Sequence, residues 1–212
     1  ASPHFYQSHV RLRPSRCPRP LAQDRPSHSD AIDAFVTTVD RRRTTCITAA
    51  CVLVTAMKAR ELGPKSLVVG DRVGIVGDAS VTPGSLARIV TVKDRKNSLS
   101  RTVDDVAKVE RTIVANIDQL IIVVAGPNPE PRRGPIDRFL VSAFHEGITP
   151  IILLTKIDLG DPPAFLHEYR NLNVKVLTTQ KGADLSELQH LLHSKTSVLV
   201  GHSGVGKSTL IN

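Results

Sequence analysis

The chain has 212 residues, of which 41% are hydrophobic, and its formal net charge is +8. This hydrophobic content is enough for one large core or two small ones, and it predicts a soluble globular protein. The longest weakly polar run, Thr44 to Met57, is too short to span a bilayer, which excludes a membrane span there. The three cysteines, Cys17, Cys46 and Cys51, lack zinc-finger or redox spacing and indicate a reduced, cytosolic protein.

Residues 1–33 form a basic, proline-rich segment. The first 60 residues hold ten Lys or Arg against four acids, and five prolines precede residue 30. Without hydrophobic periodicity, this segment is predicted to be a disordered tail. Its charge suggests a polyanionic partner such as nucleic acid. Two alternatives are a merely solvated tail and an organellar transit peptide, since the first 23 residues contain no acid.

Residues 34–101 contain several short β-rich segments with turn chemistry at Gly70-Asp71 and Gly77-Asp78. The expected strands are FVTTV, TCIT, CVLVTAM, SLVVGDRVGIVGD and LARIVTV. This spacing predicts a small OB-type barrel. Such barrels often bind oligonucleotides, although an unadorned structural module shows the same pattern. The scarcity of aromatic residues argues against recognition of single strands by base stacking.

From Gln119 onward, apolar strands alternate with helical segments. The first helix is expected over Pro135–Glu146, with Ile136, Leu140 and Phe144 on its buried face and Gly147 as its stop. A second helix is expected to begin at Asp161-Pro162, and a third to be capped by Asp184 with Glu187 completing a capping box. The expected strands are LIIVVA, PIILLT, VKVLTT and SVLV. This pattern predicts a parallel sheet covered on both faces, with its ligand beyond the carboxyl ends of the strands.

The segment GHSGVGKS, residues 201–208, follows the last of these strands and matches the phosphate-loop pattern G-x-x-x-x-G-K-[ST]. Gly204 and Gly206 allow backbone N–H groups to point at a pyrophosphate. Lys207 would reach the β- and γ-phosphates, and the Ser208 hydroxyl would ligate Mg²⁺. The predicted phosphate-binding residues are Gly201, His202, Ser203, Gly204, Val205, Gly206, Lys207, Ser208 and Thr209.

A second motif, TKID at residues 155–158, follows the strand PIILLT. A carboxylate there can accept hydrogen bonds from N1–H and the 2-amino group of guanine, a donor pair that adenine lacks. Asp158 is therefore the predicted specificity residue, which favours GTP over ATP. Lys156 would lie along the base and ribose, and Thr155 would tie this loop to the phosphate loop.

The order of these two motifs is the reverse of that in ordinary GTPases, and it resembles the circularly permuted ribosome small-subunit-dependent GTPase A (RsgA/YjeQ) family. Further matches are VGDRV at 69–73, RKNSLSR at 95–101, VANIDQLIIVVA at 114–125 and IDRFL at 136–140. Together with the phosphate loop they cover residues 34–212. The resemblance implies an α/β P-loop GTPase domain, circularly permuted and incomplete, over 102–212, preceded by an OB-type barrel over 34–101 and the disordered basic tail over 1–33.

Members of that family bind the small ribosomal subunit late in its assembly and hydrolyse GTP there. The resemblance therefore implies GTP or GDP with Mg²⁺, the subunit and its rRNA as partners, and a cytoplasmic location; we expect a monomer. The stretch LTTQKG resembles the family's S-A-K-x-G, which implies that Thr178 and Thr179 lie at the base, with the Thr179 backbone N–H serving the guanine oxygen.

The family's switch threonine, D-x-x-G and zinc ligands lie on the C-terminal side of the phosphate loop. The given sequence ends at Asn212, before these elements. We therefore expect no zinc site, weakened hydrolysis and an exposed edge at SVLV in this chain. Two alternatives remain open: a non-catalytic remnant that binds rRNA through tail and barrel, and an unrelated P-loop ATPase or kinase. His190 and His193 are interpreted as a surface pair, and Asp104, Asp105 and Glu110 as an exposed acidic stretch.

Overall fold

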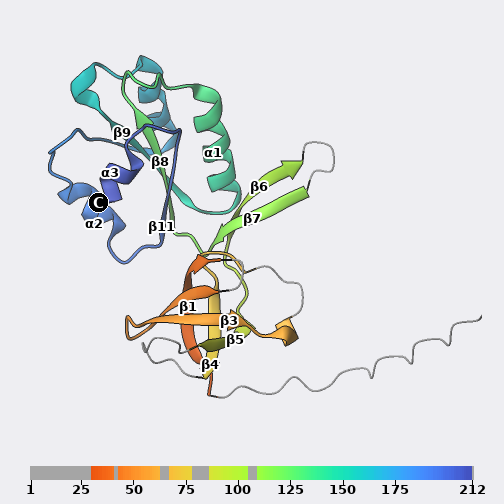
Figure 1. Ribbon diagram of the computed structural model, residues 1–212. Helices are drawn as coiled ribbons and strands as arrows, with labels where there is room; N and C mark the ends of the chain where they lie inside the picture. Colours follow the sequence, from red (N-terminus) through yellow and green to blue (C-terminus); the bar gives the residue numbers. More distant parts are fainter. Residues whose placement is uncertain (1–29, 41–42, 63–66, 78–85, 105–108, 212) are drawn as a thin grey trace, which may run out of the picture.

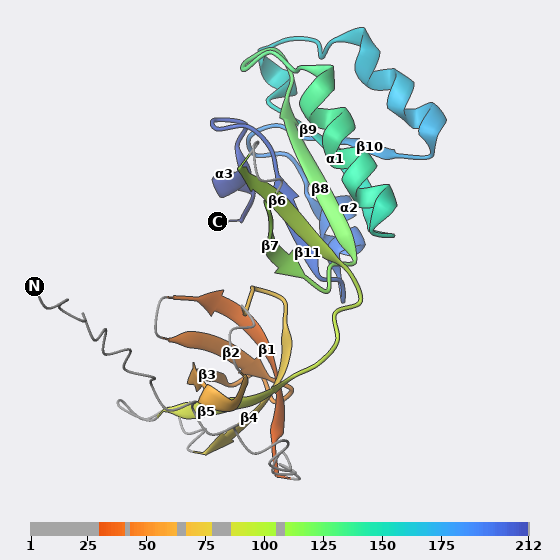
Figure 2. The ribbon, with the colours of Figure 1, turned by 90° about the vertical axis from the view of Figure 1, so that its right-hand side faces the viewer.

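The computed structural model describes residues 30–40, 43–62, 67–77, 86–104 and 109–211, and the side chains of these except in 101–111. The predicted tail lies outside these ranges up to residue 29. The described chain forms a barrel, a two-stranded ribbon and a four-stranded sheet (Figure 1). The sheet and the barrel occupy opposite ends of the molecule, and the chain passes between them beside the ribbon (Figure 2).

The N-terminal strands form a closed barrel in the order β1-β2-β3-β5-β4. All neighbours are antiparallel except β3 and β5, and β1 closes the barrel by pairing with β4 as well as with β2. This arrangement confirms the predicted OB-type barrel. Its elements are β1 (Ile32–Val39), β2 (Thr44–Thr48), β3 (Leu53–Lys58), the 3-10 turn η1 (Arg60–Leu62), β4 (Arg72–Gly77) and β5 (Ala87–Val92).

Alternate residues of the barrel strands point inward and make its core, as a period of two requires. Val36, Ile75 and Ile89 are completely buried there. Cys46 lies among them, and this burial raises the pKa of its thiol to about 11. Cys51 is exposed in the turn after β2, and both of these thiols are free.

A hairpin formed by β6 (Ser98–Asp104) and β7 (Val109–Ala115) follows the barrel. These two strands pair with each other in a separate antiparallel sheet. The sequence does not predict this ribbon, because most positions of β6 are polar and give no strong hydrophobic alternation. Two members of the predicted acidic stretch, Asp104 and Glu110, fall within its strands, and Asp105 lies outside the described residues.

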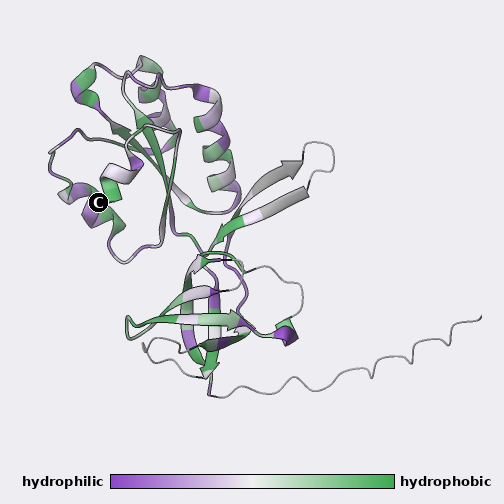
Figure 3. Cartoon of the chain, in the orientation of Figure 1, coloured by the Kyte–Doolittle hydropathy of each residue, from purple (hydrophilic) through white to green (hydrophobic). Residues whose placement is uncertain are grey.

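The C-terminal half is built on a parallel sheet in the order β10-β9-β8-β11. Its strands are β8 (Gln119–Ala125), β9 (Thr149–Thr155), β10 (Lys175–Thr178) and β11 (Ser197–Val200). The central strands are buried along almost their whole length, and they are apolar except for polar residues at their ends (Figure 3). Every residue of β11 is half-buried, and this strand lies at one edge of the sheet, as predicted.

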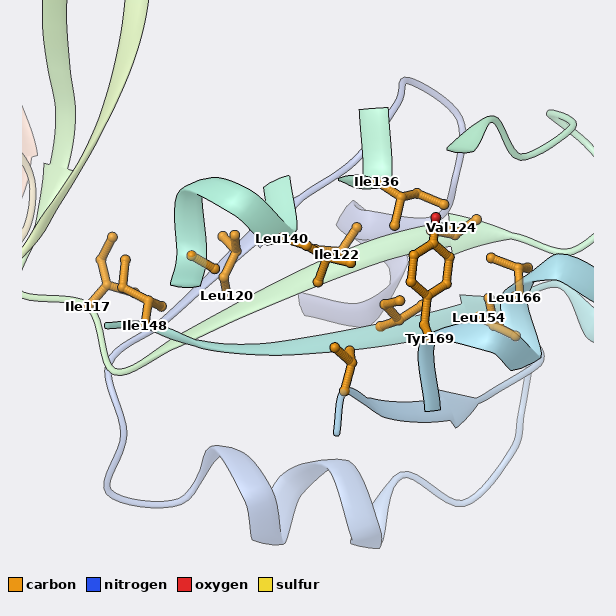
Figure 4. Close-up of a cluster of buried hydrophobic side chains, with 13 residues drawn as sticks. Ile117, Leu120, Ile122, Val124, Ile136, Leu140, Ile148, Leu154, Leu166 and Tyr169 are labelled. Carbon is orange, nitrogen blue, oxygen red and sulfur yellow. The ribbon is translucent and has the colours of Figure 1, made fainter. Parts of the chain in front are cut away.

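Helices cover both faces of this sheet. On one face, α1 (Arg133–His145) and the 3-10 segment η3 (Ala164–Leu172) pack on Leu120, Ile122 and Val124 of β8 (Figure 4). On the other face lie α2 (Ser186–Leu192) and α3 (Lys207–Ile211). The prediction of a parallel sheet between two helical layers is confirmed.

The prediction for the buried face of α1 was partly wrong. Ile136 and Leu140 are buried, but Phe144 is 54% exposed and Ala143 is buried instead. At about 100° per residue, position 144 lies about 80° round the helix from position 136, whereas position 143 lies within about 20° of it. The predicted stop is correct, since the helix ends at His145 and the Ile148 N–H donates to the Ala143 carbonyl across Gly147.

The helix starts differ from the prediction, and α1 begins at Arg133, two residues before the expected Pro135. The segment after Asp161 begins at Ala164 as a 3-10 helix, because consecutive prolines at 162 and 163 keep the preceding residues out of the helical region. The helix α2 begins at Ser186, whose N–H donates to Asp184 Oδ1 at 2.9 Å. The capping box is absent there, since the Glu187 carboxylate pairs with Lys175 Nζ at 3.0 Å.

Candidate functional site

Both predicted nucleotide motifs lie at the carboxyl end of the sheet. TKID begins at the last residue of β9, and GHSGVGKS follows β11; the two strands flank β8. Thr155 joins the two loops directly, because its Oγ1 donates to the Val205 carbonyl at 2.7 Å. This hydroxyl is buried and also lies 3.4 Å from the Val124 carbonyl oxygen. The predicted tie between the two loops is therefore present.

The phosphate loop is held tightly at its start and at Val205. A Cβ at Gly201 would lie 2.3 Å from the Val123 carbonyl oxygen, so only glycine fits at that point. Val205 is buried in the core beneath the loop, whereas His202, Ser203 and Gly204 are exposed. The loop thus has an anchored base and an open outer surface.

Lys207 begins α3 and folds back over the phosphate loop. Its ammonium donates to the carbonyls of Gly201 at 2.9 Å and His202 at 2.6 Å. Ser208 and Thr209 follow it, exposed, in the first turn of α3. A lysine ammonium over a glycine-rich backbone, followed by an exposed hydroxyl, fits the phosphates of a nucleotide and the Mg²⁺ that accompanies them.

The TKID loop turns sharply after Thr155. Lys156 has a φ of 56° and begins the 3-10 turn η2 (Ile157–Leu159), on which Asp158 is exposed. The loop after β8 braces this turn, through a hydrogen bond from the Gly126 N–H to the Thr155 carbonyl and one from Lys156 Nζ to the Asn128 carbonyl. The sequence motifs do not point to Asn128. Its only signal in the sequence is that it follows β8, the strand that lies between β9 and β11.

The predicted base contact from the Thr179 N–H is wrong. That group donates to the Leu154 carbonyl at 2.7 Å, because the pairing of β10 with β9 extends one residue beyond the strand end. A donor bonded in this way has no proton left for a guanine oxygen. Thr178 is exposed, and Thr179 is buried.

A cavity of about 510 Å³ lies next to the phosphate loop, on the side of α1. It shares Gly201, His202 and Val205 with the loop but contains no residue of the TKID motif. Its walls are otherwise largely apolar, from β8, the following proline-rich loop and α1. The cavity is therefore distinct from the predicted base site.

Among the residues that the structure describes, no group of three or more His, Cys, Asp or Glu is placed to hold a metal ion. His190 and His193 are exposed, at and just after the end of α2. Within the same residues, no helix combines the length and hydropathy needed to cross a bilayer.

A parallel sheet with T-K-x-D at one strand end and a phosphate loop at another, the base motif coming first in the chain, defines a circularly permuted P-loop GTPase fold. The family model of the RsgA GTPase matches residues 92–212, more than half of the chain. The chain belongs to the RsgA GTPase family.

Solved structures and curated relatives agree with this assignment. The crystal structure of YjeQ from Thermotoga maritima matches with a TM-score of 0.66 and 29% identity, over 85% of this chain and 64% of that one. YloQ, described as a circularly permuted GTPase, matches in fold with a TM-score of 0.66 at 23% identity, over 88% of this chain and 65% of that one.

Two relatives named "Small ribosomal subunit biogenesis GTPase RsgA" are similar in sequence. The protein from Chlorobaculum parvum is 35% identical over 171 residues, which cover 76% of this chain and 55% of the relative. The protein from Azotobacter vinelandii is 41% identical over 155 residues, which cover 69% and 43%. The chain thus spans about half the length of the curated relatives it matches.

Proposed function

We propose that the chain binds guanine nucleotides, GTP and GDP with Mg²⁺, as a factor in the biogenesis of the small ribosomal subunit. The observation that carries this proposal is the buried hydrogen bond from Thr155 to Val205, which unites the base motif and the phosphate loop in one site. Family membership and the names of the relatives support the assignment.

The proposed roles follow from where the residues lie. Asp158 reads the guanine edge, Lys156 lies along the base and ribose, and Thr155 positions both loops. Thr178 remains a base-side residue by its place at the carboxyl end of β10. The phosphates lie in the loop over residues 201–209, with Lys207 on the β- and γ-phosphates and Ser208 as the ligand of the Mg²⁺ that the nucleotide brings.

GTP hydrolysis is a separate question from binding. It depends on groups that place the attacking water and neutralise charge at the γ-phosphate, beyond the contacts to the base and β-phosphate. The residues to which we give roles serve those latter contacts. We therefore propose nucleotide binding for this chain and make phosphate release from GTP the measurement that decides turnover.

We further propose that the barrel, over residues 34–101, and the basic segment at 1–33 bind rRNA of the small subunit in the cytoplasm, while residues 102–212 form the nucleotide-binding unit. Net positive charge concentrated in the first 60 residues supports this division, because phosphate contacts by Lys and Arg release counterions. Deleting residues 1–33 should then weaken subunit binding and flatten its salt dependence. Unchanged affinity and salt slope would argue against an rRNA contact there.

The nucleotide assignment is tested by titration with GDP and ADP. We expect GDP to bind and ADP to bind at least about 100-fold more weakly, because adenine leaves the Asp158 carboxylate without its donors. Asp158→Asn should weaken GDP binding and favour xanthosine diphosphate, whose 2-oxo group accepts from the new amide. Asp161→Asn, which neutralises an exposed acid in the same loop, is the matched control. Equal affinities for GDP and ADP would contradict the guanine assignment.

A further inference from the structure

A half-buried ion pair connects the barrel to the segment that leads into the sheet. Asp71 lies just before β4 and is completely buried, and Arg95 lies between β5 and β6. Arg95 donates from Nε to Asp71 Oδ1 at 2.7 Å and from Nη2 to Oδ2 at 3.0 Å. Oδ2 also accepts the Val68 N–H at 2.9 Å. This bidentate geometry with an added backbone donor is what makes a buried carboxylate tolerable.

Next to this pair, the barrel backbone touches the end of the ribbon. A Cβ at Gly70 would lie 1.9 Å from the Ala115 carbonyl oxygen, and the φ of Gly70 is 93°. The Ala115 N–H donates to the Val69 carbonyl at 2.9 Å, and the Gly70 N–H donates to Val36 in β1 at 2.8 Å. Only glycine permits so close an approach between the two chain segments.

Two buried asparagines complete the connection. Asn116, with a φ of 55°, donates from Nδ2 to the Gly70 carbonyl at 2.8 Å and accepts the Lys96 N–H at 2.9 Å. Asn97 accepts the Ile117 N–H at 2.7 Å and donates to the Ile117 carbonyl at 2.8 Å. We call the three segments joined in this way, 68–71, 95–97 and 115–117, the polar joint.

The polar joint continues into the amino ends of the sheet strands. Asp118 follows it directly and accepts the Thr196 N–H at 2.9 Å, just before β11. Its Oδ1 lies 3.3 Å from Lys96 Nζ, and its carbonyl accepts the Thr149 N–H at the start of β9. The nucleotide motifs lie at the other ends of these strands, about 23 Å away along the seven residues of β8.

We propose that the polar joint fixes the orientation of the barrel relative to the nucleotide-binding sheet, so that the two parts move as one body, with Arg95 as its central residue. A rotation of the barrel would separate the guanidinium from a buried carboxylate and leave asparagine and backbone groups unpaired. These contacts therefore hold one arrangement and oppose a graded hinge. If the proposed function holds, a polyanion bound on the barrel keeps a fixed direction relative to the nucleotide.

The test is a distance distribution between two spin labels, measured by pulsed electron resonance on the full chain. Cys51 is exposed in the barrel and takes one label, and His190→Cys on α2 takes the other. Cys17 is replaced by Ser; Cys46 stays unlabelled, because it is buried and its thiol has a pKa of about 11. We expect a single narrow distribution for this parent protein.

Arg95→Met should broaden that distribution at least about twofold. The matched control is Lys93→Met, which removes an exposed ion pair on the surface of the barrel. In that pair Lys93 Nζ lies 2.6 Å from Asp33 Oδ2. The control should keep the parent's width. A distribution as narrow in Arg95→Met as in the parent would overturn the proposal.

A second variant keeps the test decisive if Arg95→Met loses the β-sheet circular dichroism of the parent. Asn116→Gly keeps a residue that favours positive φ and removes only the side chain's two hydrogen bonds, so it should also broaden the distribution. An unchanged width in that variant would count against the proposal. GDP affinity should stay within about twofold of the parent in both variants, whose sites are remote from the nucleotide. A parent that fails to bind GDP would sink the proposed function while the distances still decide the role of the polar joint.

Discussion

Replacing Thr155 by valine tests the bond on which the proposed nucleotide site depends. Valine has nearly the shape of threonine but cannot donate to the Val205 carbonyl, which the wild-type hydroxyl meets at 2.7 Å in a buried position. Leaving a buried acceptor unsatisfied costs about 1–3 kcal/mol. For a chain of this size, a loss near 2 kcal/mol corresponds to a fall of about 4–8 °C in the unfolding temperature.

Scanning calorimetry of the Thr155→Val protein measures this fall, and Thr178→Val provides the comparison. Thr178 ends the neighbouring strand but is exposed, so its replacement should change stability by less than about 0.5 kcal/mol. Equal unfolding temperatures for the two variants would refute the reasoning, because the hydroxyl of Thr155 would then contribute no more than one in contact with water. A larger fall for Thr178→Val would show that the two strand ends had been assigned the wrong environments.

Three further predictions concern the fold around the site. Leu140→Ala should destabilise the chain by about 2–5 kcal/mol and Phe144→Ala by far less, measured by urea unfolding, since only the first side chain is buried. Gly70→Ala should cost more than Gly182→Ala in the same assay, because both glycines have positive φ but only the first faces a backbone oxygen within 2 Å. The Thr196 N–H that donates to Asp118 holds the pKa of that carboxyl below its usual range. The stabilising contribution of Asp118 is therefore full above the unfolded pKa near 4 and should disappear as the pH falls through the folded pKa. In urea unfolding at a series of pH values, Asp118→Asn should reduce this loss of stability in acid.

The sequence was informative wherever a residue's local pattern decides its place. Continuous apolar runs predicted the buried strands β8 and β9, and the phosphate loop and TKID fell at strand ends because parallel strands share one carboxyl edge. Short β-rich segments separated by turn residues predicted the barrel. In these cases burial on one or both faces of an element determines the hydrophobic pattern of neighbouring residues in the sequence.

Errors arose where contacts distant in the chain decide the outcome. The sequence does not show which side of α1 faces the sheet, so Phe144 was placed inward, although it lies about 80° round the helix from Ile136 and is exposed. The Thr179 N–H looked available from its motif, but the register of β10 against β9 gives it to Leu154. The ribbon of β6 and β7 is polar enough that only its pairing reveals it.

The polar joint explains a part of the resemblance that nucleotide chemistry does not. Two of the matching segments, VGDRV and RKNSLSR, and the first five residues of a third, VANIDQLIIVVA, contain no residue near the phosphate loop or TKID, yet each contributes residues to the polar joint. VGDRV supplies the close glycine and the buried carboxylate, RKNSLSR the guanidinium and one asparagine, and VANID the other asparagine and the aspartate that continues into the sheet. Residues with such specific geometry, at the end of the sheet remote from the proposed nucleotide site, fix the orientation of the barrel relative to the sheet. A chain that needed only a nucleotide pocket would have no use for this half-buried ion pair, since apolar packing would hold two domains together at less cost in desolvation.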